Sequence, residues 1–163
     1  MRRRVKRGPV RLLAYRNHDA FPFHDLAWNP RRREFLLASS RYGDVLLTRL
    51  DSQGNRVGEQ IPVVTSHGHG SAIATTERGR HLLTYSVGNH AYYQRIGRRL
   101  RLGPARRVST ASTEYVDGGA VVTTTPTGFG LAWVQALGPD DPGYPNYSLA
   151  DREIFYRGVN VAP

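Results

Sequence analysis

Residues 26–65 read LAWNPRRREFLLASSRYGDVLLTRLDSQGNRVGEQIPVVT, and this stretch decides the fold because the chain repeats its pattern twice. Residues 72–110 and 120–163 follow the same order of apolar runs and turn residues, the third copy with a polar insert. Two positions recur in the alignment: Leu37, Leu83 and Leu131 at one, and Arg49, Arg95 and Arg157 at the other. The first two members of each set lie about 46 residues apart, a spacing typical of stacked or radial arrays.

Each repeat is predicted to contain four short strands. In the first repeat the apolar and β-branched runs place them at 25–29, 34–39, 45–50 and 60–64. Turn-forming stretches separate the runs, and Gly54 and Asn55 in DSQGNRVG suit a backbone with positive φ. No segment of helical length carries an apolar stripe with the helical period. The sequence therefore predicts an all-β fold of antiparallel strands.

Four antiparallel strands in a repeated unit are the pattern of a β-propeller blade. The best-matching piece is FLLASSRYGDVLLTRLDSQGNRVG, residues 35–58, and on it the chain resembles bacterial β-propeller repeat proteins. The resemblance covers most of the chain but includes no WD or Asp-box motif. It implies three propeller-type blades in one domain, 1–163, with repeats at 8–57, 58–102 and 103–163. A β-prism, a trefoil and an open sandwich remain alternatives.

The two ends of the chain predict how such a ring would close. Residues 8–15 align with 58–65 and with 103–110, so the chain begins with an outer strand. The last repeat ends after its third strand and lacks an outer strand of its own. Propellers have about four to eight blades, so three are too few for a ring. We expect Val10–Tyr15 of one chain to complete the third blade of another, giving a six-bladed homodimer.

Composition limits the other possibilities. The chain has no cysteine, which excludes disulfides and thiolate metal sites. No apolar run reaches the roughly 18 residues of a membrane span, and the start, MRRRVKRGPVRLL, lacks the apolar centre of a secretion signal. We therefore expect no membrane partner and a cytoplasmic location, unless a secretion leader has been removed.

The net charge of +10 is carried by 22 arginines and one lysine. It fits either an anionic partner or the codon bias of a GC-rich genome. Antiparallel strands place the turns after the first and third strands of each repeat at one end, and with the basic N-terminal segment this end is predicted to carry 14 of the 23 basic residues. The predicted anion-binding residues are Arg31, Arg32, Arg33, Arg98 and Arg99. This end, with the basic segment before residue 8, predicts a non-specific contact with an anionic polymer.

The opposite end is predicted to collect most acids and five of the six histidines. It also carries the long segment 136–150, ALGPDDPGYPNYSLA, and long loops are often functional. Propeller ligands usually bind near the ring centre, where the first strands of the repeats begin. The predicted ligand-binding residues are His24, Asp25, Tyr42, His69, Asp117, Tyr144 and Tyr147.

Three functions follow, and we expect the first: a non-enzymatic, lectin-like module that binds a glycan or small ligand without a cofactor. The second is a propeller glycoside hydrolase with carboxylates from Asp25, Glu114 and Asp117 as acid/base and nucleophile. The third is an anionic-polymer-binding or scaffold protein that uses the arginines. A metal site at His24, His67 and His69 is a weak alternative, since the spacing matches no known signature. Neither GxSxG nor a phosphate-binding loop with lysine is present.

Overall fold

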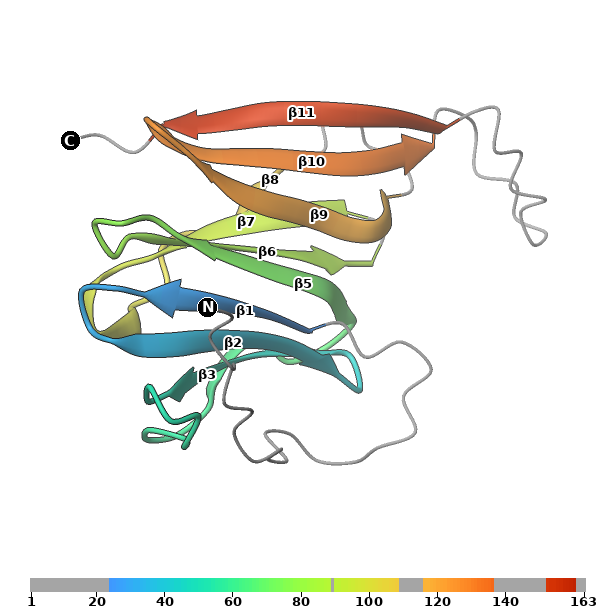
Figure 1. The fold of residues 1–163 in the computed structure, drawn as a ribbon. Helices are drawn as coiled ribbons and strands as arrows, with labels where there is room; N and C mark the ends of the chain where they lie inside the picture. The colour runs from blue at the N-terminus through green and yellow to red at the C-terminus, as the bar shows by residue number, and fades with distance from the viewer. Residues whose placement is uncertain (1–23, 89, 109–115, 137–151, 161–163) are drawn as a thin grey trace, which may run out of the picture.

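The computed structural model describes residues 24–88, 90–108, 116–136 and 152–160. In this part the strands form three antiparallel sheets, and the single helical element is one 3-10 turn, η1 (Arg98–Leu100). The all-β prediction is confirmed. Figure 1 shows the sheets stacked one over another, in chain order. None of the helical structure in the described ranges is long and apolar enough to cross a membrane.

Sheet A is formed by the first repeat. Its strands lie side by side in chain order: β1 (His24–Asn29), β2 (Glu34–Arg41), β3 (Asp44–Leu50) and β4 (Ile61–Val64). The ends of these strands lie within two residues of the predicted ends. The alternation of apolar and polar residues, together with Gly43 and Gly54 at positive φ in the turns, explains why the local prediction succeeded.

Sheet B repeats this order, and sheet C repeats its first three strands. Sheet B contains β5 (Gly68–Thr75), β6 (His81–Val87), β7 (His90–Ile96) and the short β8 (Arg106–Arg107). Sheet C contains β9 (Val116–Thr125), β10 (Gly128–Ala136) and β11 (Arg152–Asn160), with β11 at its edge. Within the described ranges sheet C thus has no outer strand, as the third repeat predicted. The expected donor strand, Val10–Tyr15, lies outside the described residues.

Two apolar cores hold the sheets face to face. We call the face of a sheet that is turned toward the next sheet in the chain its front, and the opposite face its back. The front of sheet A packs on the back of sheet B through residues that include Leu36, Val45, Leu47, Ile73 and Leu83. The front of sheet B packs on the back of sheet C through residues that include Leu82, Tyr93, Phe129, Leu131 and Trp133.

Strand pairing tests the predicted alignment of the repeats. Leu83 and Leu131 both lie on the back of their sheets, and Leu37, opposite Leu26, lies on the back of sheet A, so the leucine register is confirmed. Arg49 and Arg95 stand opposite Leu36 and Leu82, on the front of their sheets.

Arg157 departs from this register. It stands opposite Leu131, on the back of sheet C, whereas Arg49 and Arg95 lie on fronts. Its predicted equivalence to them is wrong by one residue, and one residue reverses the face of a strand. The polar segment 137–151 precedes this strand, and its length has no counterpart in the other repeats from which a register could be read.

Candidate functional site

A cleft of about 650 Å³ lies between sheets A and B, at the end of the stack that holds the β1–β2 and β5–β6 turns. We call this end the turn face and this cavity the A–B cleft. The segment after β7, including Gly97 and Leu100, closes one side of it. Its polar lining residues are Asn29, Arg31, Arg32, Arg78, Arg80 and His81.

The β1–β2 turn is shaped by a buried asparagine. The Oδ1 of Asn29 accepts hydrogen bonds from the backbone N–H groups of Arg31 (3.1 Å) and Arg32 (3.3 Å). The carbonyl of Asn29 also accepts the N–H of Arg33 at 2.9 Å, which closes the turn. Asparagine favours such local bonds to the backbone at turns. The turn thereby fixes the backbone from which two of the cleft arginines project.

The β5–β6 turn is held by a threonine and a glycine. Thr76 accepts the N–H of Gly79 at its carbonyl (2.8 Å) and the N–H of Arg80 at its Oγ1 (3.2 Å). Gly79 has φ of +71°, and a Cβ there would stand 3.0 Å from the Oδ1 of Asn29 and 3.1 Å from the Cβ of Arg31. Only glycine suits that conformation and that close approach. The two turns therefore touch at Gly79.

A histidine joins the two sheets at the floor of the cleft. The amide Nδ2 of Asn29 donates to the Nε2 of His81 at 3.3 Å, while the Nδ1 of His81 lies 2.8 Å from the Oγ1 of Thr75. Because Nε2 accepts, the proton of the neutral ring is on Nδ1, and a second proton would face the donor amide. Burial lowers the pKa of His81 to about 4, against an opposing influence of Glu34 and a small further lowering by Arg32. His81 is therefore neutral near pH 7.

The cleft has a surplus of positive charge. Glu34 is buried beside it, but its Oε2 accepts from the Nε (3.0 Å) and Nη2 (2.7 Å) of Arg49. The nearest cleft arginine, Arg32, stands 3.9 Å from Glu34 Oε1. Arg31 and Arg78 have no ion-pair partner among the residues that the structure describes. A negative ligand would therefore find guanidinium groups without a bound carboxylate.

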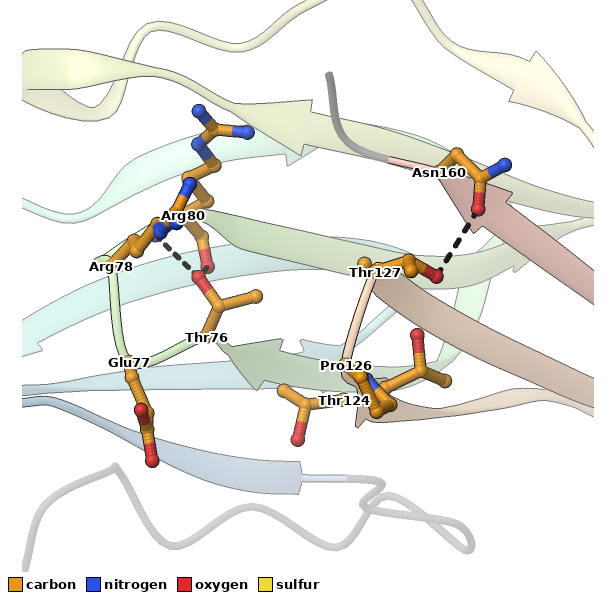
Figure 2. A pocket seen from close by; sticks show the side chains of 10 residues that line it. Thr76, Glu77, Arg78, Arg80, Thr124, Pro126, Thr127 and Asn160 are labelled. Atoms are coloured by element: carbon orange, nitrogen blue, oxygen red, sulfur yellow. Dashed lines mark hydrogen bonds between the residues drawn. The ribbon is translucent and has the colours of Figure 1, made fainter. Parts of the chain in front are cut away.

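A second cleft, of about 830 Å³, lies on the turn face between sheets B and C, and Figure 2 shows it from close by. We call it the B–C cleft. The β5–β6 turn forms one wall and the β9–β10 turn the other, and Thr127 bonds Asn160 across the end of sheet C at 3.4 Å. Its lining is richer in hydroxyls: Thr76, Thr124, Thr125 and Thr127. Arg78 and Arg80 line both clefts, so the β5–β6 turn separates two adjacent sites.

The predicted anion-binding residues fall partly on these clefts. Arg31 and Arg32 line the A–B cleft, and Arg33 is an exposed neighbour with φ of 54°. Arg98 and Arg99 belong to η1, whose Leu100 lines the same cleft. Asn29, Gly79 and His81 were missed as site residues. The Asn-Pro pair at 29–30 and the glycine at 79 are turn signals that could have pointed to two of these positions.

The predicted ligand-binding residues at the opposite end are placed as follows. His24 and Tyr42 are exposed, and Tyr42 lies in the β2–β3 turn with its ring 5.3 Å from the guanidinium of Arg41. His69 is half-buried in β5 and pairs with Ser86. Asp117 pairs with Val134 in sheet C. Glu114, Tyr144 and Tyr147 lie outside the described residues.

Both carboxylate oxygens of Asp25 accept backbone hydrogen bonds, and one of these bonds links sheet A to sheet B. The Oδ1 accepts the N–H of Leu26 at 2.8 Å, and the Oδ2 accepts the N–H of Ile73 in β5 at 2.9 Å. These bonds give Asp25 a structural role at the junction of sheets A and B.

The predicted metal site is not formed by the described residues. The described ranges contain no cluster of three His, Asp or Glu side chains that could hold an ion. His67, in the turn before β5, is exposed at φ of 55°.

No protein-family model, curated protein or solved structure matches this chain.

Proposed function

We propose that this protein binds an anionic ligand, one bearing sulfate, phosphate or carboxylate groups, on its turn face. The observation that carries the proposal is the A–B cleft, where four arginines from two sheets line one cavity. Arginine presents a planar set of donors that matches such anions, and the weak hydration of its charge favours binding.

The ligand is expected to be larger than a single ion. The A–B cleft has a volume of about 650 Å³, and Arg78 and Arg80 extend the positive lining into the B–C cleft. An elongated anion that crosses the β5–β6 turn would contact arginines in the first cleft and threonine hydroxyls in the second. A chain of charged groups fits this arrangement better than an isolated phosphate does.

The propeller architecture belongs to the same proposal. Three meander sheets packed face to face are consistent with three consecutive blades, and an outer strand is lacking from sheet C in the described part. We propose that a ring of six blades forms from two copies of the chain. The clefts between blades would then recur around the turn face.

The lectin-like site at the opposite end remains a prediction, and so does glycoside hydrolysis. Neither gains a specific observation, because Asp25 is occupied by two backbone N–H groups, Asp117 is placed only by its strand pairing with Val134, and Glu114 lies outside the described residues. The binding experiment below includes a neutral glycan, which separates the lectin-like function from anion recognition.

The experiment measures binding of a fluorescent heparin hexasaccharide and of neutral maltohexaose by anisotropy, between 50 and 300 mM salt. Arg31→Ala/Arg78→Ala is compared with a charge-matched control, Arg56→Ala/Arg106→Ala, which removes two exposed arginines outside both clefts. A charge-assisted hydrogen bond contributes about 1.5–3 kcal/mol, so the cleft variant should weaken heparin binding at least tenfold.

The salt dependence provides a second measurement. The slope of log affinity against log salt should fall by about one for each ligand charge that loses its arginine. Equal losses in the two double variants would mean that only overall charge matters, and would overturn the site. Binding of maltohexaose as tight as that of heparin would favour the lectin-like function instead.

A further inference from the structure

Among the described residues, no sheet packs against two faces of the stack: the front of sheet C and the back of sheet A. The junctions within the chain give a standard against which to judge them. Each is made in the same way, because the first strand of one sheet crosses the front of the sheet before it: β5 packs on β1, β2 and β3, and β9 packs on β5, β6 and β7. The same contact thus occurs twice.

The front of sheet C carries the apolar residues that this contact would bury. Strand pairing makes Ile154 the equivalent of Val45 and Ala91. Each of the three pairs with the residue that follows the shared leucine of its sheet by three positions. Val45 and Ala91 are fully buried, whereas Ile154 is 80 % exposed.

A second front position gives the same result. Tyr156 is the equivalent of Leu47 and Tyr93, which are both buried under the next sheet. Tyr156 itself is 68 % exposed, and Val121 on β9, which flanks the same Ala132 of β10 from the other side, is also exposed. An exposed cluster of this kind on a soluble surface marks an interaction site.

The back of β1 carries the complementary residues. Leu26 is the equivalent of Ile73 in β5 and Val122 in β9, because each pairs with the shared leucine of its sheet. Ile73 is 4 % exposed in the junction of sheets A and B, but Leu26 is 47 % exposed, and Trp28 beside it is exposed too. The residue type is kept. Within the described part of the chain no further sheet packs over Leu26 and Trp28, although Leu37 on the same face is itself buried.

We propose that the front of sheet C binds the back of strand β1 in a second copy of this chain, with Val121, Ile154 and Tyr156 against Leu26 and Trp28. The proposal rests on the ring architecture proposed above and identifies the two surfaces that join. The occupant is a second copy because one chain presents both halves of a contact that it already makes twice internally. The contact joins two different surfaces, so two copies close a ring through two such junctions.

The experiment measures mass in solution by sedimentation and light scattering over a hundredfold range of concentration. We expect the unmodified protein to have the mass of two chains. Val121→Asp/Ile154→Asp, on the front of sheet C, and Leu26→Asp, on the back of β1, should each give monomers. Tyr42→Asp places the same charge on an exposed aromatic away from both surfaces and should leave the dimer unchanged. Circular dichroism establishes that each variant is folded.

Mixing the two defective variants distinguishes this contact from others. A front-defective chain still has an intact back, and Leu26→Asp still has an intact front, so a one-to-one mixture should regain association through one junction. A monomeric unmodified protein overturns the proposal without recourse to any variant. Loss of the dimer in the front variant but not in Leu26→Asp overturns it as well, because the front of sheet C would then bind itself.

Heparin binding separates this proposal from the function on which it depends. The A–B cleft is built within one chain, so monomeric Val121→Asp/Ile154→Asp should retain it with an affinity within about threefold of the unmodified protein. Arg31→Ala/Arg78→Ala should in turn form the dimer normally. Failure of heparin binding with an intact dimer rejects the anion site alone.

Discussion

The A–B and B–C junctions repeat one backbone arrangement but differ in how much of each is hydrogen-bonded and how much is aromatic core. At the A–B junction, hydrogen bonds between side chains or between a side chain and the backbone cross from sheet to sheet: Asn29 to His81, Ile73 to Asp25 and Ser40 to Ser71. At the B–C junction, the Oγ1 of Thr84 donates to the carbonyl of Ala120 and Arg95 donates to the carbonyl of Asn160. The larger part of this junction is an apolar core that contains the rings of Tyr93, Phe129 and Trp133. The difference indicates that the B–C junction contributes more to stability, while polar bonds at the A–B junction position the turns of the cationic cleft.

The largest expected effect comes from the B–C core. Phe129 is almost completely buried, so Phe129→Ala should lower the free energy of unfolding by about 3–5 kcal/mol. Asn29→Ala, at the A–B junction, should cost less, about 1–3 kcal/mol, by leaving buried polar groups without partners. Urea unfolding followed by circular dichroism measures both. A greater loss of stability in Asn29→Ala than in Phe129→Ala would mean that the A–B junction contributes more to stability than the B–C junction.

The next prediction concerns the pH dependence of stability, which should come from His81 at the A–B junction. The pKa of His81 is lowered from 6.5 to about 4 in the folded protein, so between these values the unfolded chain binds a proton that the folded chain does not. Stability should therefore fall as pH drops from 6.5 to 4, by on the order of 3 kcal/mol from this group. Below pH 4 both states are protonated and the loss from His81 is complete.

The measurement is the thermal midpoint at each half pH unit for the unmodified protein and for His81→Gln. The carboxylates titrate in both proteins, so the difference between the two curves isolates His81. His24→Gln, which removes an exposed histidine, is the control for the loss of an imidazole as such. Parallel curves for His81→Gln and the unmodified protein would contradict the buried neutral imidazole.

Gly79 tests whether the A–B junction shapes the cleft. Gly79→Ala adds a methyl group at φ of +71° against Asn29 and Arg31, and should cost about 1–2 kcal/mol of stability and weaken heparin binding several-fold. Gly54→Ala is the matched control, because Gly54 has φ of +82° and nothing within 4 Å of the added atom. It should lose stability with no change in binding. Equal heparin binding by Gly79→Ala and Gly54→Ala would mean that the contact between the two turns does not shape the cleft.

The smallest effect is expected at the opposite end of the stack. Tyr42→Ala removes an exposed ring in contact with Arg41 and should change stability by less than about 1 kcal/mol. Heparin binding, measured by anisotropy, should be unchanged. A glycan array with hits that disappear in Tyr42→Ala would revive the lectin-like prediction for that end.

The sequence by itself determined the local structure. The strands of sheet A, the shared leucine position and the short third sheet could be read from alternation, turn residues and repetition, because these depend on neighbours along the chain or on the regular pleat of a strand. The register of Arg157 could not, since the segment before it has no equivalent in the other repeats. The concentration of arginines in the turns could be predicted, but which of them share a cavity could not.

Only the tertiary structure decided the site. Asn29 meets His81 across 52 positions, and Gly79 approaches Arg31 from another sheet. Such contacts depend on the shift and the rotation of one sheet relative to the next. The packing of side chains from both faces determines that shift and rotation. The exposure of Ile154 is decided in the same way: its residue type is that of a buried front position, and only the stacking of the sheets leaves it uncovered.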